Sequence, residues 1–355
     1  MPLMASAQVL AINGHQLNFA SNVPAPPAPL SVGAVINGYS VVTSPSYTPS
    51  STLVYYQGTT NLIIENKSFT GIGAGIQLWE CSNITIRNCK FKNISGAAIH
   101  YENCNNVKVE NCIFDSIGDG VIATSNHSNA YNGGTNSTLV VQHCYFKNTI
   151  GGWPGHHSVQ MAGTSGGGIK INYNTFENIH LQSHVDDIIS CFDTFGSMLD
   201  SVQIIGNWFR GGDHNIENHT GGAITIGDNG SSYIHVKNNI LINVVGGGIG
   251  LAGGHDITVE NNTLYQSQAL ANPANQTAGL IMFNFDAVPS IATCYNNTIQ
   301  KNKVYYQTST GATIDFEYSA SNKNCTDAQG TLTNVSDPTL NASILPITIS
   351  NLYHW

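Results

Sequence analysis

Charged residues are scarce in this chain of 355 residues, where Asp, Glu, Lys and Arg together make up only 9%. An ordinary soluble domain carries about a quarter. The 12 basic side chains are outnumbered by 21 acidic ones, which gives a net charge of -9. No nucleic-acid partner is predicted, because binding to a phosphate backbone requires a basic stripe and the sequence has none. Solubility must come from Asn, Ser, Thr and Gly, and this composition favours a secreted or cell-surface protein.

Long apolar runs, a signal peptide and metal-binding cysteine motifs are also lacking. No apolar run reaches the roughly 18 residues that a membrane span requires, so no membrane span is predicted. The N-terminal stretch MPLMASAQVL lacks the basic and apolar regions of a signal peptide. The eight cysteines form no CxxC motif and no zinc-finger spacing, so no metal site is predicted from them.

The sequence contains a repeat instead. An apolar–any–apolar triplet is followed by Asn, a small residue, and an aromatic or aliphatic residue, as in NITIRNCKF at 83–91. The shortest period is 22 or 23 residues, and periods of 30 to 33 residues contain inserted loops. Further copies begin at residues 61, 106, 138, 168, 201, 233 and 256, with a weaker ninth copy at 297. A second apolar strand precedes each copy, so each coil has at least two strands on a common pitch.

This repeat predicts an all-β fold, a right-handed parallel β-helix of about nine coils. Alternating residues such as Ile84 and Ile86 point into the core while Thr85 points out. An antiparallel sandwich is disfavoured because hairpin turns do not recur at this fixed period. Six Phe side chains should stack in one internal column: Phe69, Phe91, Phe114, Phe146, Phe176 and Phe209. A turn Asn recurs once per coil and could form a hydrogen-bonded ladder: Asn88, Asn111, Asn174, Asn207, Asn239 and Asn262.

The whole chain is expected to form one domain, because each repeat of a solenoid packs only on its neighbours. The β-helix is expected over residues 35–320. Residues 1–34 are interpreted as a lead-in or N-terminal cap. Residues 321–355 are interpreted as a C-terminal cap, which a solenoid needs to cover its last exposed core layer.

Five of the eight cysteines fall in two columns of the repeat. Cys89, Cys112 and Cys144 share one column, and Cys81 and Cys104 share another. Buried free thiols are the favoured interpretation of these columns, since Cys is among the residues most often buried. The best candidates for a disulfide lie outside the columns, flanking the last coil: Cys294 and Cys325.

Loops inserted at the same turn in consecutive coils mark a candidate site, because solenoid insertions cluster on one face that often binds ligand. Three of them follow the Phe column, at 148–157, 178–187 and 210–222, and a fourth lies at 265–278. They hold an unusual set of acids, imidazoles and other polar or aromatic side chains: Trp153, His156, His157, His184, Asp186, Asp187, Arg210, His214 and His219.

An alignment of the strands predicts which of these side chains are neighbours. It takes as equivalent the first core residues Ile122, Val159, Ile189 and Ile224. The alignment then places Asp119 beside His156, His156 beside Asp186, and His157 beside Asp187, each pair one strand spacing of about 5 Å apart. At the other end of the same strands, Asp193 and Asp228 fall in one column. Two carboxylates at that spacing would raise one pKa and could supply an acid and a base.

The repeat resembles the pectate-lyase-like superfamily of parallel β-helix proteins, over roughly residues 35–320. The stretch VDDIIS at 185–190 is similar to the aspartate pair that opens a strand in polygalacturonase-type glycoside hydrolases of this fold. The other motifs of those hydrolases, Asn-x-Asp, Gly-His-Gly and Arg-x-Lys, do not occur at matching coils. The resemblance therefore implies the region of a site and leaves its chemistry open. Lyases of the superfamily use a Lys or Arg base, often with Ca²⁺.

The favoured function is a secreted enzyme that cleaves a polysaccharide backbone, with hydrolysis by paired carboxylates ahead of β-elimination. Two alternatives stay open: a lyase or epimerase acting on uronates, for which Ca²⁺ is a possible cofactor, and a non-catalytic carbohydrate-binding or adhesive solenoid. The oligomeric state, monomer or homotrimer, is also left open. The predicted catalytic residues are Asp186, Asp187, Asp193, Asp228, His156 and His157. The predicted substrate-binding residues are Trp153, Arg210, His184, His214, His219 and Gln160.

Overall fold

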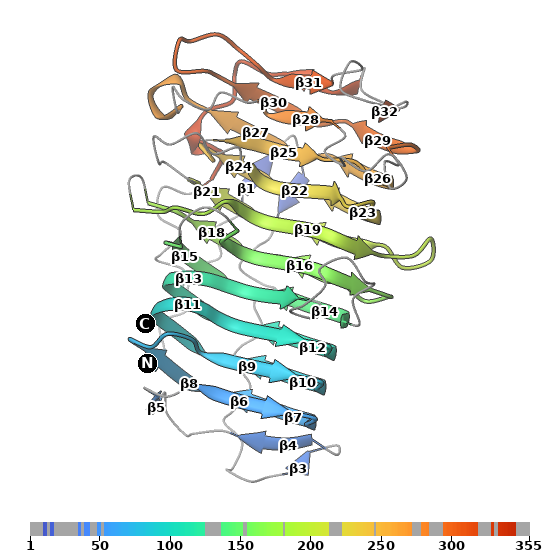
Figure 1. Ribbon diagram of the computed structural model, residues 1–355. Coiled ribbons are helices and arrows are strands. Elements are labelled where there is room, and N and C mark those ends of the chain that lie inside the picture. The colour runs from blue at the N-terminus through green and yellow to red at the C-terminus, as the bar shows by residue number, and fades with distance from the viewer. Residues whose placement is uncertain are drawn as a thin grey trace.

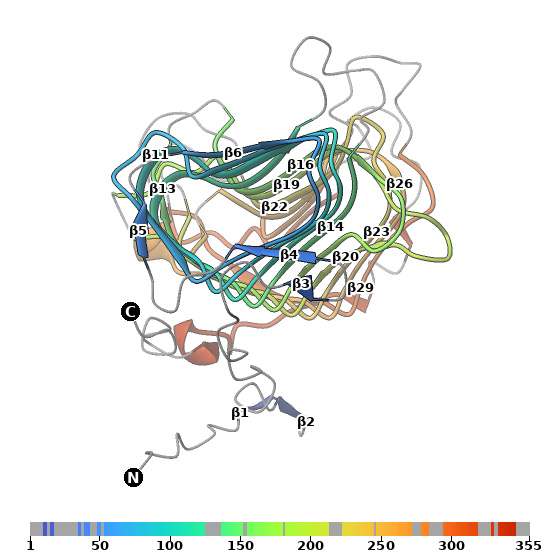
Figure 2. The same cartoon turned by 90° about the horizontal axis from the view of Figure 1, so that it is seen from below.

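The chain folds as a parallel β-helix in which every coil contributes strands to three sheets (Figure 1). The computed structural model describes residues 53–124, 136–151, 155–179, 182–212, 222–244, 246–271, 278–283, 294–318 and 333–345, together with short strands within 10–17, 35–50 and 328–329. Viewed from below, the coils lie almost on top of one another around a common interior (Figure 2). The sequence predicts about nine coils, and the front sheet alone has ten strands in the described part of the chain.

The front sheet faces the viewer in Figure 1 and pairs each strand in parallel with the next coil. Two long strands, β11 and β13, bend to serve both the third sheet and the front sheet. The strands of the front sheet are β6 (Val54–Gln57), β9 (Ile76–Trp79), β11 (Lys90–Glu102), β13 (Ile113–Thr124), β16 (His157–Ser165), β19 (Asp187–Phe195), β22 (Gly222–Asp228), β25 (Gly247–Leu251), β28 (Leu280–Met282) and β31 (Phe316–Tyr318).

The other two sheets close the coil behind the front sheet. The second sheet contains β4 (Tyr39–Val42), β7 (Thr60–Glu65), β10 (Ser82–Arg87), β12 (Asn105–Glu110), β14 (Asn136–Gln142), β17 (Lys170–Asn172), β20 (Val202–Ile205), β23 (Ser232–Lys237), β26 (His255–Glu260), β29 (Asn297–Gln300) and β32 (Ala328–Gln329). The third contains β5 (Thr48–Ser50), β8 (Lys67–Thr70), the first halves of β11 and β13, β15 (Tyr145–Thr149), β18 (Thr175–Glu177), β21 (Trp208–Arg210), β24 (Ile240–Ile242), β27 (Thr263–Gln266), β30 (Lys303–Tyr306) and β33 (Val335–Ser336).

Short elements complete the described chain. Two antiparallel pairs lie near the N-terminus, β1 (Leu10–Ile12) with β2 (His15–Leu17) and β3 (Val35–Ile36) with β4. Two 3-10 helices, η1 (Gln268–Leu270) and η3 (Ala342–Ile344), lie in the C-terminal half. Near η3, Leu345 packs on Trp208, Ile240 and Ile242, on the outside of the third sheet. The cap assigned to residues 321–355 stays a prediction.

The Phe column forms as predicted. All six rings are buried, with at most 2% of each residue exposed. Consecutive rings lie 4.4–5.0 Å apart between centroids and within 16° of parallel. The spacing matches that of neighbouring strands, so each ring covers the ring of the next coil and the core repeats without a gap.

The Asn ladder forms in the later coils. Four of the six predicted positions take part, and Asn302 and Asn334 replace the predicted Asn88 and Asn111. From Asn207 onward, each amide oxygen accepts from the backbone N–H of the Asn one coil earlier, at 2.9–3.0 Å, and the oxygen of Asn174 accepts from Cys144 N at 2.9 Å. Each Nδ2 donates to a carbonyl oxygen about one coil earlier in the chain, as Asn207 does to Ile171 O. The members are Asn174, Asn207, Asn239, Asn262, Asn302 and Asn334. Asn88 and Asn111, which the alignment included, precede the ladder column by one residue. They have left-handed φ of 52° and 53°, a conformation that Asn tolerates well.

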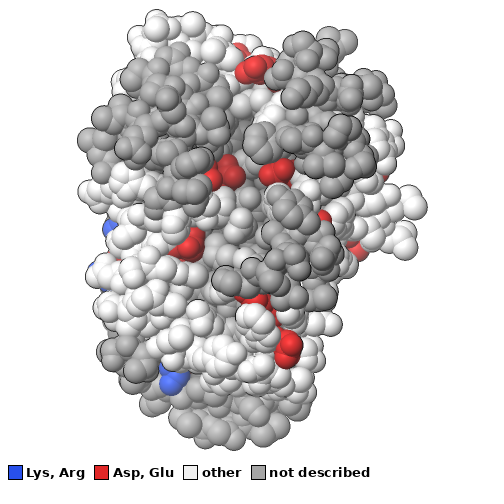
Figure 3. All heavy atoms as spheres, in the orientation of Figure 1, with Lys and Arg blue, Asp and Glu red and all other residues white. Residues whose placement is uncertain are grey.

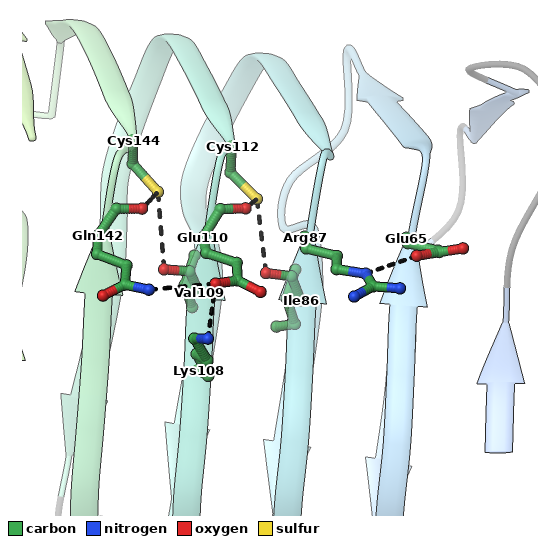
Figure 4. A network of polar contacts seen from close by, with 9 residues as sticks. All are labelled: Glu65, Ile86, Arg87, Lys108, Val109, Glu110, Cys112, Gln142 and Cys144. Carbon is green, nitrogen blue, oxygen red and sulfur yellow. Dashed lines mark hydrogen bonds and ion pairs between the residues drawn. The ribbon is translucent and has the colours of Figure 1, made fainter. Parts of the chain in front are cut away.

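Cysteine takes the place of Asn in the ladder column of the early coils. Cys144 Sγ donates to Val109 O, and Cys112 Sγ donates to Ile86 O, both at 3.8 Å (Figure 4). These contacts correspond to the Asn174 Nδ2 bond to Val141 O at 2.9 Å. The thiol therefore repeats the donor role of the amide with a longer, weaker bond.

The outer faces of the second and third sheets carry charges of alternating sign. On the second sheet Arg87 Nε contacts Glu65 Oε2 at 2.6 Å (Figure 4), and Lys237 Nζ contacts Glu260 Oε1 at 2.8 Å. On the third sheet the register places one charge per coil in a single row: Lys92, Asp115, Lys147, Glu177 and Arg210. Opposite charges on neighbouring strands favour this register, and like charges would oppose a slipped one.

Removing one ladder amide should destabilise the β-helix. In Asn207→Ala, Asn174 N and Ile171 O lose their bonds to the Asn207 side chain, and unsatisfied buried groups of this kind cost about 2–4 kcal/mol together. Chemical denaturation should show that loss of unfolding free energy. The matched control is Asn238→Gly at the exposed neighbour with φ 57°, which should change little. Equal stability of both variants would contradict the role of the ladder.

Thiol titration should find six free thiols in the unfolded, unreduced protein. Cys81, Cys89, Cys104, Cys112, Cys144 and Cys191 are free and buried, and Cys294 is disulfide-bonded. Its predicted partner Cys325 lies outside the described residues. Burial raises the pKa of Cys104 to about 12, so the folded protein should react slowly with alkylating reagents, which need the thiolate. Eight thiols before reduction would rule out a disulfide, and fewer than six would show that the column thiols are oxidised.

Candidate active site

Three polar residues share one column where the front-sheet strands begin. The register pairs Val121 with Val159 and Val159 with Ile189, which brings Asp119, His157 and Asp187 into successive coils. His157 lies opposite Asp187 as predicted. The predicted equivalence of Ile122 and Val159 is wrong by one residue, since Ile122 pairs with Gln160.

Asp119 holds two consecutive histidines of the next coil. Its Oδ1 accepts from the backbone N of His157 at 2.9 Å, and its Oδ2 lies 3.0 Å from His156 Nδ1. The predicted neighbourhood of Asp119 and His156 is therefore present despite the slipped register. A carboxylate on Nδ1 favours the tautomer with its proton there, which leaves Nε2 free to accept a proton. The His156 side chain is 34% exposed, so this dyad is reachable from solvent.

His157 is buried between the two carboxylate-bearing coils. Its Nδ1 accepts from the backbone N of Asp187 at 3.3 Å. Burial lowers the pKa of His157, and the charge of Asp186 opposes that shift. A neutral His157 therefore connects the coil of Asp119 with the coil of Asp187.

Asp187 has the most perturbed carboxyl of the column. Burial raises its pKa to about 6, and hydrogen bonds from Gly222 and Thr225 partly offset that rise. Its Oδ1 accepts from Gly222 N at 2.7 Å and from Thr225 Oγ1 at 2.6 Å. A carboxyl group that keeps its proton to near-neutral pH is suited to act as a general acid.

Asp186 and His184 flank this column. Asp186 N donates to His156 O at 2.9 Å, and Asp186 Oδ2 accepts from Gly155 N at 3.3 Å. His184 is half-buried, and its backbone N donates to Thr149 O. Asp186 thus lies beside His156 as predicted, where it holds the segment that leads into β16.

Gln160 lies on the outer row of the front sheet, three residues beyond His157. The register continues this row through both neighbouring coils, from Ile122 to Gln160 and on to Ser190. Gln160 is half-buried, so its amide remains accessible on the same face as the column.

Asp193 and Asp228 do not face each other, contrary to the alignment. The register passes from Ser190–Thr225 to Phe192–Asp228, because Gly227 is an extra residue with φ 86° that forms a bulge. The side chain of Asp193 bonds to Asn229, and burial raises the pKa of Asp193. Asp228 Oδ1 accepts from the backbone N of Asn229 at 2.9 Å. Both carboxylates thus bind the turn that follows β22, and their predicted pairing is wrong.

Arg210 lies on the outer face of the third sheet, away from the column. It pairs in register with Glu177, and its Nη2 donates to Leu345 O at 3.4 Å. Burial lowers the pKa of Arg210, and Glu177 opposes that shift. The predicted role of Arg210 in the groove is therefore replaced by a contact with the C-terminal segment.

Three predicted substrate-binding residues, Trp153, His214 and His219, lie outside the described residues. Sequence reasoning missed Thr225, whose bond to Asp187 depends on two strands that start 35 residues apart. The strand alignment placed Asp119 beside His156, but Asp119 was not among the predicted catalytic residues. The signal for Asp119 was its place in the same column of the repeat as the two histidines.

Among the described residues, the front sheet carries acidic side chains but no Lys or Arg, since Lys90 and Lys92 lie in the half of β11 that belongs to the third sheet. Figure 3 shows acids across this face, with Lys and Arg at its lower left end and margin. The described Lys and Arg residues lie in or beside strands of the second and third sheets: Lys67, Arg87, Lys90, Lys92, Lys108, Lys147, Lys170, Arg210, Lys237, Lys301 and Lys303. The remaining basic residue is Lys323, outside the described residues.

Within the described ranges, no three His, Cys, Asp or Glu side chains gather in a way that could hold a metal ion. The described helices are too short to include a candidate membrane span.

Comparison with solved structures finds other proteins of similar shape at low sequence identity. An alginate lyase from Paenibacillus sp. is 11% identical with a TM-score of 0.42, covering 65% of this chain and 86% of its own. DFA-IIIase from Arthrobacter chlorophenolicus is 10% identical with a TM-score of 0.35, covering 79% and 63%. The A-module of a mannuronan C-5 epimerase from Azotobacter vinelandii is 12% identical with a TM-score of 0.32, covering 81% and 90%.

Likeness at this level does not carry an activity from one protein to another. No curated protein matches the chain in sequence. One family model does match, described as the right-handed β-helix region, over residues 40–335. That match spans most of the 355 residues and agrees with the three parallel sheets. The chain therefore belongs to the right-handed β-helix family.

Proposed function

We propose that this protein hydrolyses glycosidic bonds of a polysaccharide, with Asp187 as general acid and the Asp119–His156 pair as general base. The observation that carries the proposal is the raised pKa of Asp187, about 6, in a column that also holds a carboxylate–histidine dyad. Asp187 would protonate the leaving oxygen. His156 Nε2 would take a proton from the attacking water, while Asp119 stabilises the imidazolium that results.

The spacing of the column favours inversion at the anomeric carbon. Asp119 and Asp187 lie two coils apart, which is about 10 Å between backbones at the spacing of parallel strands. Inverting glycosidases separate acid and base by about 6.5–9.5 Å to leave room for a water molecule, whereas retaining enzymes need about 5–5.5 Å. Because His156, and not Asp119 itself, would accept the proton, the base lies closer to Asp187 than the two backbones do. This arrangement fits the larger separation of an inverting enzyme.

The lyase or epimerase alternative needs a positive group to neutralise the uronate carboxylate. The described front sheet has no Lys or Arg, and no cluster of ligands for Ca²⁺ occurs among the described residues. Hydrolysis needs neither, so it is favoured. A solenoid that only binds carbohydrate would not need a carboxyl group such as that of Asp187, which keeps its proton up to about pH 6. Secretion or display at a cell surface, where polysaccharides occur, remains part of the proposal.

The Asp187→Asn variant should lose activity while keeping the fold. Asn retains an oxygen that can accept from Gly222 N and Thr225 Oγ1, but it cannot donate the acid proton. A panel of polysaccharides, assayed for reducing ends and for ultraviolet-absorbing unsaturated uronates, identifies the substrate and separates hydrolysis from elimination. Turnover should then fall on the order of a hundredfold or more. Asp193→Asn is the control: Asp193 binds the turn at Asn229 rather than the column, so turnover of the folded enzyme should stay within a few-fold. A larger loss of turnover in Asp193→Asn than in Asp187→Asn would move the site to the turn that follows β22.

The stability of the protein should depend on pH through Asp187. Its folded-state pKa of about 6 exceeds the usual value of about 3.9, so between these values the folded state binds more protons than the unfolded state. The contribution of Asp187 to unfolding free energy therefore falls as pH rises from about 4 to about 6, by at most about 3 kcal/mol. Asp187→Asn lacks this dependence, so its stability relative to wild type should increase between pH 4 and pH 7. A difference that stays constant over that range would show that the carboxyl has an ordinary pKa.

A further inference from the structure

The outer rows of the front sheet continue below the candidate site with side chains suited to sugars. One row runs coil by coil through Tyr55, Gln77, His100, Ile122 and Gln160. The next row, two residues further along each strand, holds Gln57, Trp79, Glu102 and Thr124. We call the part of this surface formed by Gln77, Trp79 and His100 the lower track. Amides, an imidazole and an aromatic ring are groups that hydrogen-bond to hydroxyls and pack against the apolar face of a ring.

Polar contacts fix the orientation of His100 in the lower track. His100 Nε2 lies 2.8 Å from Thr124 Oγ1, which in turn donates to Glu102 Oε1 at 3.2 Å. Glu102 is buried with 1% of its surface exposed, and His100 Nε2 lies 3.5 Å from its Oε1. Thr124 and Glu102 therefore hold the imidazole in place, while 22% of the His100 side chain remains exposed on the front sheet. A side chain fixed in this way loses little entropy on binding a ligand.

The charge distribution of the front sheet favours one kind of polysaccharide over another. The described basic residues lie on the second and third sheets, where ion pairs and alternating rows engage many of them. The undescribed segments within residues 125–293 also contain no Lys or Arg in the sequence. A uronate polymer carries one carboxylate per sugar, and the described front sheet offers no Lys or Arg to neutralise it, while the carboxylates at the column would repel it. An uncharged chain avoids this repulsion entirely.

We propose that the lower track binds the non-reacting part of an uncharged polysaccharide, so that the enzyme selects neutral glycans over uronate polymers. This inference rests on the proposed hydrolytic function, because the lower track would bind the same polysaccharide that the column cleaves. Binding of a polysaccharide to the lower track can be measured separately from its cleavage. The chain would extend from the column at Asp187 towards the N-terminal coils. Trp79 would pack against a sugar ring, and Gln77 and His100 would bond to hydroxyl groups.

The test measures binding and cleavage on the same proteins. The probes are dextran, inulin, mannan, xylan and mixed-linkage glucan as neutral glycans, with polygalacturonate and alginate as anionic ones, studied by affinity electrophoresis and calorimetry. One neutral glycan should bind at least tenfold more tightly than either anionic polymer. Its affinity should not change with salt concentration, because no ionic contact is involved.

Substitutions in the lower track should weaken that binding. Trp79→Ala and His100→Ala should each reduce affinity for the neutral glycan about tenfold, the effect expected for a lost aromatic contact or hydrogen bond. His235→Ala is the matched control, since His235 lies in β23 on the second sheet, and it should bind as wild type does. Thermal melting checks that each variant is folded.

Each outcome separates this inference from the proposed function. Tighter binding of polygalacturonate or alginate, or neutral binding unaffected by Trp79→Ala and His100→Ala, overturns the inference even if Asp187→Asn abolishes cleavage. Track-dependent binding of a neutral glycan without cleavage by the wild type supports the inference and overturns the proposed hydrolysis. Failure of every neutral probe to bind the wild-type protein also overturns the inference.

Discussion

The structure depends on the constraint that every coil must repeat the backbone path of the coil before it. Parallel pairing between coils satisfies the main chain, and two side-chain columns keep that register along the axis. The stacked Phe rings fill the same space in each coil. The Asn ladder satisfies backbone groups at a turn, where strand pairing alone would leave them without bonds. A slip of one residue would turn both columns outward, so the register is strongly specified wherever they occur.

The same constraint decides where chemistry can be placed. A residue in one coil meets its equivalent in the next coil at a single strand spacing, so functional groups distant in sequence come together in columns. Asp119, His157 and Asp187 are separated by 30 to 38 residues, yet they occupy successive coils at the start of the front sheet. Burial in this column raises the pKa of Asp187, and the neighbouring coil supplies the histidine dyad.

Charge is separated between the faces of the solenoid. Ion pairs and rows of alternating sign on the second and third sheets bring Lys and Arg beside acids, and thereby stabilise the stacking of coils. The front sheet carries acids but no Lys or Arg in the described part of the chain. The excess negative charge of the sequence thus contributes to the face that bears the candidate site. This separation is the feature of composition on which the proposed preference for uncharged substrates rests.

The sequence by itself determined the β-helix, because a repeat of apolar alternation, turn residues and Phe has one consistent packing. It also predicted the region of the site and the neighbours His157 and Asp187, since both follow from counting along adjacent repeats. Only the tertiary structure decided the details that depend on local irregularities. The bulge at Gly227 separates Asp193 from Asp228, and the thiols of Cys112 and Cys144 act in a column that the sequence pattern assigned to Asn. The register of β21 places Arg210 on the outer face of the third sheet, where it contacts the C-terminal segment. A one-residue insertion leaves the periodic pattern of the sequence almost unchanged, but it shifts the residues beside it by one position relative to the neighbouring coil.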